Sequence, residues 1–355
     1  MLKRLTAAAA LGLLAAPALA QELPPGPKVR VLAVTQVLTN LPQYTKVDQP
    51  VLRDALPKKA NGRIEVQLFS WPERNVNGPE VLRLVRSGQV DVGSAPLGMV
   101  AGDAPLLDGM DLAGLAPDIQ TARRIADALT PHVNRDLERI GIRMVATLAF
   151  SKQVMFCRKA VPSLTDLQGM KVRAAGPSLG DLVKSFNGQP VSVNFGEVYT
   201  ALERGTIDCA VTGTGGGNSA KWTEVTSHLV NYPMQWAVAG YYVNLAWWNK
   251  LDAPVRALLE KTFQEITDKQ WTLGSEITED GLACNFGNAS GCKIHTLLKK
   301  PLTEVKAGDA ASAAAVRKQL VEVVLPNWVK RCGERCGQIY NEVVAPISGV
   351  KYTPR

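Results

Sequence analysis

The stretch that decides the fold class is residues 29–94, VRVLAVTQVLTNLPQYTKVDQPVLRDALPKKANGRIEVQLFSWPERNVNGPEVLRLVRSGQVDVGS. It alternates short apolar segments of strand length with segments of helical period, and a glycine follows each helical segment. Strands are expected at residues 29–34, 63–69 and 90–94, and helices at residues 48–60 and 79–87. This β-α-β-α-β order is typical of a doubly wound sheet, so the sequence predicts an α/β fold.

The same alternation continues through the rest of the chain. An amphipathic pattern at residues 119–140 precedes a strand at 143–150, and a second series of strands and helices begins near residue 151. From there on, strands are expected at residues 154–158, 171–174, 191–193 and 206–211, and helical segments at 164–167, 179–186, 197–203, 254–271, 311–323 and 329–344.

Two such series predict two lobes. The first lobe is expected to comprise residues 21–150 and about 240–278, and the second residues 151–239 and about 279–355 with the C-terminal helices. The long helix at 254–271 runs between the lobes. We expect a ligand in the cleft between them, because open α/β sheets bind their ligands in such crevices.

Residues 1–20 have the pattern of a secretory signal peptide. Lys3 and Arg4 precede a run rich in alanine and leucine, which ends in the small-x-small sequence Ala18-Leu19-Ala20. The run is shorter than the roughly 18 residues that a membrane anchor needs, and polar residues interrupt every later apolar stretch. We therefore expect cleavage after Ala20 and a soluble, exported protein.

The charge excludes one class of partner. The net charge is +8, or +6 without Lys3 and Arg4, and the basic residues are scattered along the chain. A nucleic-acid-binding surface needs clustered lysine and arginine, so the sequence predicts no nucleic-acid partner. The basic excess indicates a solvated surface with a mild preference for anions.

Six cysteines in an exported chain favour disulfides. They are Cys157, Cys209, Cys284, Cys292, Cys332 and Cys336. The third and fourth flank a turn-forming stretch and can close a small loop, whereas the last two can bridge each other or reach back to that pair. The first two lie in apolar strand segments and either pair or stay buried as thiols. No CxxC pair occurs, so no metal site is expected.

One motif suggests catalysis. Residues 176–180, GPSLG, match GxSxG and lie between an expected strand and an expected helix, as a nucleophile elbow would. The oxyanion segment and the acid–histidine pair of such hydrolases are not visible, and His228 and His295 are the only downstream histidines. A simpler interpretation is that residues 176–178 form the turn and cap of the next helix. A serine hydrolase using Ser178 is therefore the less favoured alternative.

A glycine-rich run, GTGGGN at residues 213–218, follows the strand expected at 206–211. It lacks the end of a P-loop and the spacing of a dinucleotide fingerprint. We expect it to line the cleft, because it lies at the carboxyl end of a strand, and no cofactor is predicted.

The most specific pattern lies between residues 162 and 208. Its parts are PSLTDLQGMKVR at 162–173, GQP at 188–190 and NFGEVYTALERGTID at 194–208, with weaker matches in GRI at 62–64 and SGQVD at 87–91. This pattern resembles the solute receptors of TRAP transporters, the tripartite ATP-independent periplasmic systems. The resemblance covers most of the mature chain and fades after residue 271.

The resemblance implies a two-lobed periplasmic binding protein rather than an enzyme. Such a receptor binds a small organic acid in the periplasm and delivers it to the membrane subunits of the transporter, and we expect a monomer. A sensor subunit that reports the same ligand to a membrane kinase is the alternative function, and the sequence does not separate the two.

The resemblance also implies site residues. Arg173 matches the arginine that forms a paired salt bridge with the ligand carboxylate, a role that suits the rigid fork of a guanidinium. Phe195 matches a ring that packs on the ligand. Thr212 replaces a frequent asparagine, and Gln153 stands where acid-sugar binders have a second arginine, which argues against a sialic acid. Lys152 beside it can still supply charge.

Aromatic residues are expected near the cleft. Trp71 directly follows the second strand, and Trp222 follows the glycine-rich run. Trp236 and Tyr241 lie where the chain returns between the lobes. Such rings can stack on a flat ligand, and ordinary packing explains each of them equally well. Together they favour a bulky or aromatic carboxylate over a small dicarboxylate.

Overall fold

The computed structural model describes residues 23–161, 163–164, 167–306 and 310–354, and the expected signal peptide and its cleavage site after Ala20 lie outside these residues. The described chain forms one mixed nine-stranded sheet in the order β2-β1-β3-β8-β4-β7-β5-β6, with β9 beside β8. The strands are β1 (Val29–Val34), β2 (Ile64–Phe69), β3 (Val92–Pro96), β4 (Ile142–Cys157), β5 (Lys171–Arg173), β6 (Gln189–Val191), β7 (Cys209–Gly213), β8 (His228–Asn244) and β9 (Thr303–Lys306).

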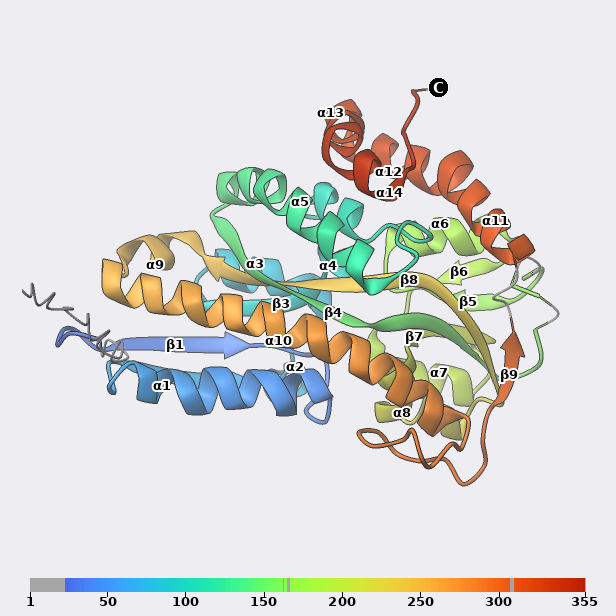
Figure 1. Cartoon of the computed structure of the whole chain (residues 1–355), viewed down its shortest axis with the longest axis horizontal. Helices are drawn as coiled ribbons and strands as arrows, with labels where there is room; N and C mark the ends of the chain where they lie inside the picture. Colours follow the sequence, from blue (N-terminus) through green and yellow to red (C-terminus); the bar gives the residue numbers. More distant parts are fainter. Residues whose placement is uncertain (1–22, 162, 165–166, 307–309, 355) are drawn as a thin grey trace, which may run out of the picture.

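Helices lie on both sides of this sheet (Figure 1). The main ones are η1 (Gln43–Ala55), α1 (Leu56–Lys59), α2 (Trp71–Arg74), α3 (Val81–Arg86), α4 (Leu97–Val100), η3 (Pro105–Met110), α5 (Ile119–Arg139), α6 (Pro177–Ser185), α7 (Val198–Glu203), α8 (Thr214–Ser219), α9 (Leu245–Lys250), α10 (Ala253–Asn285), α11 (Ala310–Gln319), α12 (Leu325–Cys332), α13 (Glu334–Ile339) and α14 (Ala345–Ser348). The predicted α/β class is confirmed. None of the helices in the described ranges is long and apolar enough to cross a membrane.

Two long antiparallel strands connect the two halves of the sheet. β1, β2 and β3 are parallel to one another on one side, and β5, β6 and β7 are parallel on the other. β4 and β8 pair along most of their length between these groups. We call the part around β1–β3 the first lobe and the part around β5–β7 the second lobe.

The prediction of two separate strands at 143–150 and 154–158 is wrong, because both belong to β4. Irregularities in the β4–β8 pairing lie between Ala149 and Lys152 and between Gln153 and Met155. A bulge bends a strand and increases its twist, so one strand can pass from lobe to lobe without ending. The polar Ser151-Lys152-Gln153 segment, which lies between the two predicted strands, is at this bend.

Two helices are longer than the sequence suggested. η1 begins at Gln43 rather than at residue 48. Gln43 is polar but buried, so the apolar pattern of the buried helix face does not show where the helix begins. α10 continues to Asn285 instead of ending at Trp271. Its last turns bury Gly274, Thr278 and other small or polar residues, so the apolar period that marks a helix fades there.

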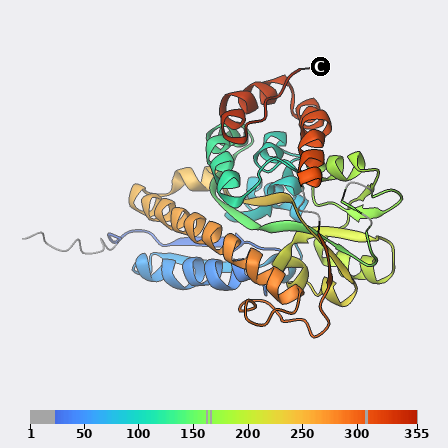
Figure 2. The same cartoon turned by 45° about the vertical axis from the view of Figure 1, so that its right-hand side comes forward.

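α10 passes along both lobes in Figures 1 and 2. At the first lobe, Gln270 Nε2 donates to the carbonyl oxygen of Gln43 at 3.1 Å. At the second lobe, Gly281 lies against the backbone of Thr214 and Gly215 in α8, so closely that a Cβ at residue 281 would collide with it. α10 therefore makes contacts with both lobes.

The C-terminal helices form a group on the side of α5 and α6 (Figures 1 and 2). Trp328 Nε1 donates to the carbonyl oxygen of Pro105 at 3.0 Å, and Arg331 forms an ion pair with Asp181 at 2.7 Å. All six cysteines are paired, as Cys157–Cys209, Cys284–Cys292 and Cys332–Cys336. Of the alternatives left open, Cys157 and Cys209 form a disulfide rather than staying thiols, and Cys332 bridges Cys336 rather than the loop pair.

Candidate ligand-binding site

Two adjoining cavities lie between the lobes, with volumes of about 510 Å³ and about 60 Å³. They share walls formed by Val37 and Met99 of the first lobe and by Arg173, Ala175 and Phe195 of the second. One molecule seated against Arg173 can therefore occupy space in both cavities.

The lobes touch beside these cavities. Gly98 and Gly176 approach so closely that a Cβ on Gly176 would lie 2.8 Å from the Cα of Gly98. Asn40 Nδ2 also donates to the carbonyl oxygen of Ser219 at 3.0 Å across the gap. Any side chain at residue 98 or 176 would hold the lobes apart, so the two glycines permit the close approach.

Arg173 ends β5 and is the buried charge of the site, with 2% of its surface exposed. Its Nε donates to the carbonyl oxygen of Val193 at 3.2 Å and its Nη1 to that of Val211 at 3.0 Å. Burial alone lowers its pKa to about 10, so the guanidinium stays protonated at neutral pH. Within the described ranges no carboxylate is paired with it, and a buried charge of this kind is stabilised by an anion.

Two aromatic rings hold the guanidinium in place. The carbon at its centre lies 5.8 Å from the ring centroid of Phe195 and 6.0 Å from that of Trp222. The two rings are 5.2 Å apart. Phe195 also lines both cavities, whereas Trp222 is fully buried behind it. The rings favour a cation at this position and limit the directions in which Arg173 can point.

Gln153 and Thr212 line the smaller cavity together with Arg173. They come from neighbouring strands, β4 and β7, which are paired in this region. Gln153 Nε2 donates to the carbonyl oxygen of Ser151 at 2.7 Å, which fixes the orientation of the amide. An amide and a hydroxyl group therefore line the same cavity as the guanidinium, and each can exchange hydrogen bonds with a polar ligand.

Trp71 lines the larger cavity. Its indole Nε1 donates to the carbonyl oxygen of Ser94 at 3.1 Å, so this donor is already used within the first lobe. The indole N–H therefore has no bond left for a ligand, whereas the face of the ring can still stack on one.

Three residues expected at the cleft do not line either cavity in the described structure: Lys152, Trp236 and Tyr241. Successive side chains of a strand point to opposite faces. Gln153 and Ala237 line the smaller cavity, so the adjacent Lys152 and Trp236 point away from it. Lys152 Nζ donates instead to Asn231 at 2.8 Å.

Tyr241 belongs to a buried cluster of the first lobe. Its hydroxyl donates to Asp48 Oδ1 at 2.5 Å and accepts from Gln36 Nε2 at 3.2 Å and from Gln270 Nε2 at 3.0 Å. All bonding positions of this hydroxyl are used inside the protein. The interpretation of Tyr241 as a cleft residue is therefore replaced by a packing role.

Ser178 is fully buried at the start of α6, and its hydroxyl donates to Asp108 Oδ1 at 3.0 Å. Gly176 is the residue that caps this helix. In the part of the chain that the structure describes, no histidine is bonded to Ser178, and no group of three or more potential metal ligands gathers. The motif is a helix start, as its simpler interpretation proposed.

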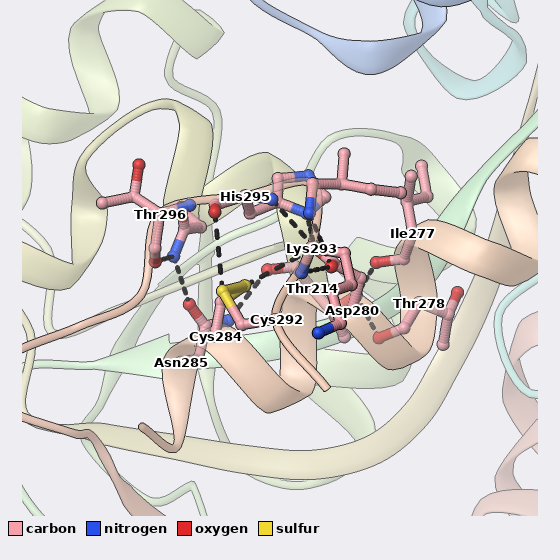
Figure 3. Close-up of polar contacts among 12 residues, drawn as sticks. Thr214, Ile277, Thr278, Asp280, Cys284, Asn285, Cys292, Lys293, His295 and Thr296 are labelled. Carbon is pink, nitrogen blue, oxygen red and sulfur yellow. Dashed lines mark hydrogen bonds and ion pairs between the residues drawn. A yellow bond between two sulfur atoms is a disulfide. The ribbon is translucent and has the colours of Figure 1, made fainter. Parts of the chain in front are cut away.

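His295 and Gln43 also line the smaller cavity, and no sequence pattern predicts either of them as a ligand residue. His295 follows the Cys284–Cys292 disulfide loop and is bonded to Asp280 on α10 (Figure 3). Neither residue belongs to a recognisable motif. Only the folded arrangement of η1, α8 and the loop after α10 brings them to Arg173.

Comparison with known proteins agrees with this architecture. Residues 35–318 match the family described as DctP, bacterial extracellular solute-binding protein, family 7. The chain is 26% identical over 227 residues to the 2,3-diketo-L-gulonate-binding periplasmic protein YiaO of Escherichia coli K12, a match that covers 63% of this chain and 69% of that protein.

Solved structures share the fold. An extracytoplasmic solute receptor of Bordetella pertussis that binds pyroglutamic acid superposes with a TM-score of 0.75 at 18% identity, covering 89% of this chain and 99% of the receptor. A TRAP periplasmic solute-binding protein of Desulfovibrio salexigens with bound orotic acid gives a TM-score of 0.77 at 18% identity, covering 90% and 100%. At this identity the likeness establishes the two-lobed fold.

Proposed function

The chain belongs to the DctP family of bacterial extracellular solute-binding proteins, a family of receptors rather than enzymes, and from this premise we propose its ligand and its site. The ligand is an organic acid, and its carboxylate forms a salt bridge with Arg173 between the lobes. The loaded receptor then delivers the acid to the membrane subunits of a TRAP transporter.

One observation carries the proposal. Arg173 is buried, protonated and bonded to two carbonyl oxygens, Val193 and Val211, and it faces two cavities. A carboxylate offers two oxygens to the guanidinium fork and supplies the charge that the surrounding protein does not. Gln153, Thr212 and Phe195 complete the surroundings of the acid, and Trp71 contacts its far end.

The relatives support an acid of this kind. The Bordetella pertussis receptor binds pyroglutamic acid, and a TRAP periplasmic solute-binding protein of Sulfitobacter, with a TM-score of 0.74 at 16% identity, contains β-D-galacturonate. These molecules differ in shape, and each of them is an acid. We therefore propose that this chain binds a ligand with a carboxylate, and we do not propose a particular compound.

Lobe closure is the proposed binding mechanism. The acid docks on Arg173 of the second lobe, and the first lobe, proposed to comprise residues 21–150 and about 240–278, closes over it. β4, β8 and α10 connect the lobes and are the elements that bend. Closure removes water from the ion pair. This strengthens binding when the other lone pairs of the carboxylate oxygens also accept hydrogen bonds.

We further propose that the receptor acts as a monomer in the periplasm after removal of residues 1–20. The experiment that tests the function is a thermal-shift screen of the mature protein against aliphatic, hydroxy, keto, cyclic and aromatic acids. A ligand that binds the folded state raises the melting temperature by mass action.

The matched control is the neutral amide of each acid. We expect at least one acid to raise the melting temperature in a concentration-dependent manner and its amide to have no effect, because the amide cannot pair with Arg173. A screen in which every acid fails, or in which amides act as well as acids, would contradict the proposal.

A further inference from the structure

His295 occupies an unusual position in the smaller cavity. Its side chain is only 2% exposed and lies on the same cavity wall as Arg173, Gln153 and Thr212. Within the described structure its Nε2 atom has no hydrogen-bond partner. Leaving a buried polar atom unpaired costs free energy, so a ring that served only to hold the loop would be expected to have both nitrogens paired.

The other ring nitrogen is firmly engaged. His295 Nδ1 lies 2.7 Å from Asp280 Oδ1 (Figure 3). The same carboxylate accepts from the backbone nitrogens of Lys293, Ile294 at 2.7 Å and His295 at 2.9 Å. Burial acts to raise the pKa of Asp280, but these hydrogen bonds outweigh it and lower the pKa, so Asp280 is ionised.

This bonding assigns the tautomer of His295. An ionised carboxylate only accepts hydrogen bonds, so Nδ1 carries the proton that it donates to Asp280. Burial lowers the pKa of His295, against the opposing effect of Asp280, so the ring is neutral at neutral pH. Nε2 is then an acceptor without a donor.

Further contacts fix the ring against α8. Asn218 Oδ1 accepts from the backbone nitrogen of Thr296 at 3.0 Å, and Asn218 Nδ2 donates to the carbonyl oxygen of the same residue at 2.9 Å. Gly215 lies directly beside Nε2, and a Cβ there would collide with the ring. The glycine-rich start of α8 therefore leaves the space that the imidazole occupies.

A second unpaired acceptor lies on the opposite lobe. Gln43, at the start of η1, lines the same cavity, and its Oε1 is buried without a partner among the described residues. Arg173, Gln43 and His295 thus line one cavity, and this wall combines a donor-only guanidinium with two buried acceptors that lack a partner among the described residues, Gln43 Oε1 and His295 Nε2. The complement is a molecule with a carboxylate and a separate N–H or O–H group.

We propose that His295, positioned by Asp280, is a specificity-determining residue that accepts a hydrogen bond from an N–H or O–H group of the bound acid. The inference rests on the proposed function, since it assumes that the carboxylate lies on Arg173. The ligand class is thereby narrowed to hydroxy acids and to acids with a ring N–H, and acids that lack such a donor bind more weakly.

The test uses pairs of acids that differ in the donor: lactate and propionate, mandelate and phenylacetate, and pyroglutamate and its lactone, 5-oxotetrahydrofuran-2-carboxylate. Dissociation constants are measured by calorimetry for the wild type, His295→Leu and His295→Gln. In the pair that binds, we expect the wild type to prefer the donor-bearing acid at least tenfold. His295→Leu reduces the preference to less than threefold by weakening that acid alone, and His295→Gln, which keeps an acceptor, retains part of it.

A measurement on the unaltered protein guards against misfolding of the variants. In ¹⁵N spectra of the histidine-labelled wild type, the Nε2 resonance of His295 should be that of an unprotonated nitrogen. It should shift on titration with the donor-bearing acid and not with its partner.

The outcomes separate the two proposals. If no acid binds the wild type, the proposed function fails and the inference fails with it. If acids bind without a preference for the donor, if His295→Leu weakens both members of a pair equally, or if the Nε2 resonance does not respond, the inference alone is overturned.

Discussion

Two buried polar clusters of this protein differ in how their charge is balanced. In the first lobe, Asp48 accepts from Thr35 Oγ1 at 2.6 Å, from Gln36 Nε2 and Gln270 Nε2 at 2.9 Å each, and from the hydroxyl of Tyr241 at 2.5 Å. We call these five residues the Asp48 cluster. Arg173, in the second lobe, has two backbone carbonyls and no carboxylate within the described ranges.

The comparison separates a structural charge from a binding charge. The Asp48 cluster satisfies its carboxylate from three elements of the protein, the end of β1, β8 and α10, so it holds the first lobe together. The charge of Arg173 has no carboxylate partner among the described residues, so an anion bound in the cavity is what would neutralise it. A buried charge with its partners inside the fold has a structural role, and one that lacks a partner beside a cavity indicates a ligand.

The largest effect is expected at Arg173. Truncating one partner of a buried charge pair costs roughly 2 to 5 kcal/mol, so Arg173→Met should weaken acid binding about 30-fold or more. Calorimetry with the acid found in the screen measures this loss. The matched control is Arg204→Met, an exposed arginine of the same lobe, which should change the affinity less than twofold. Retained affinity in Arg173→Met would remove the distinction between the clusters.

The next effect is on stability rather than binding. Asp48→Asn places an amide N–H₂ among four donors, and we expect a loss of about 2 to 4 kcal/mol in the free energy of unfolding at pH 7, measured with urea. Asp54→Asn, at an exposed position of the same helix, should cost less than about 0.5 kcal/mol. Acid affinity should be nearly unchanged in both variants, and a large loss in Asp48→Asn would place this cluster in the binding site.

The pH dependence of stability sharpens the same comparison. Burial raises the pKa of Asp48 to about 6, against the hydrogen bonds from Thr35, Tyr241, Gln36 and Gln270. Between about pH 4 and pH 6 the folded state therefore binds this proton more tightly than the unfolded chain, so the stability contribution is present below that window and is lost as pH rises through it. The loss should be about 2 to 3 kcal/mol, and it should disappear in Asp48→Asn. If the stability of the wild type and that of Asp48→Asn changed with pH in the same way, Asp48 would not be the group that causes the loss.

The smallest effect is expected from neighbours on β4. Gln153 lines the smaller cavity and Lys152 points away from it to Asn231. Gln153→Ala should weaken acid binding about 3- to 10-fold through a lost hydrogen bond, and Lys152→Ala should change it less than about twofold. Equal losses in the two variants would show that the strand faces are assigned wrongly.

The sequence was sufficient for the alternation of strands and helices and for most of the cavity wall. Trp71, Gln153, Arg173, Phe195 and Thr212 were proposed from their positions near strand ends or from the resemblance, and all five line the cavities. Trp71, Arg173 and Thr212 lie at or beside the ends of the short strands β2, β5 and β7, and a local pattern predicts that such ends reach the cleft. Gln153, within the long strand β4, and Phe195, outside any strand, follow from the resemblance alone.

The other residues depend on long-range geometry. The side chains of Lys152 and Trp236 point away from the cavity because of the register in which β4 pairs with β8 around its irregularities. No local sequence pattern predicts such a register. His295 reaches the cavity because Asp280 and the disulfide loop hold it against α8. Contacts of this kind exist only after folding.

The most direct test of the central claim is a crystal structure of the mature protein with the acid identified in the screen. We predict that the carboxylate of the acid lies within hydrogen-bond distance of the guanidinium of Arg173, between the two lobes. An acid bound elsewhere, or bound in the cavity with its carboxylate turned away from Arg173, would contradict the account.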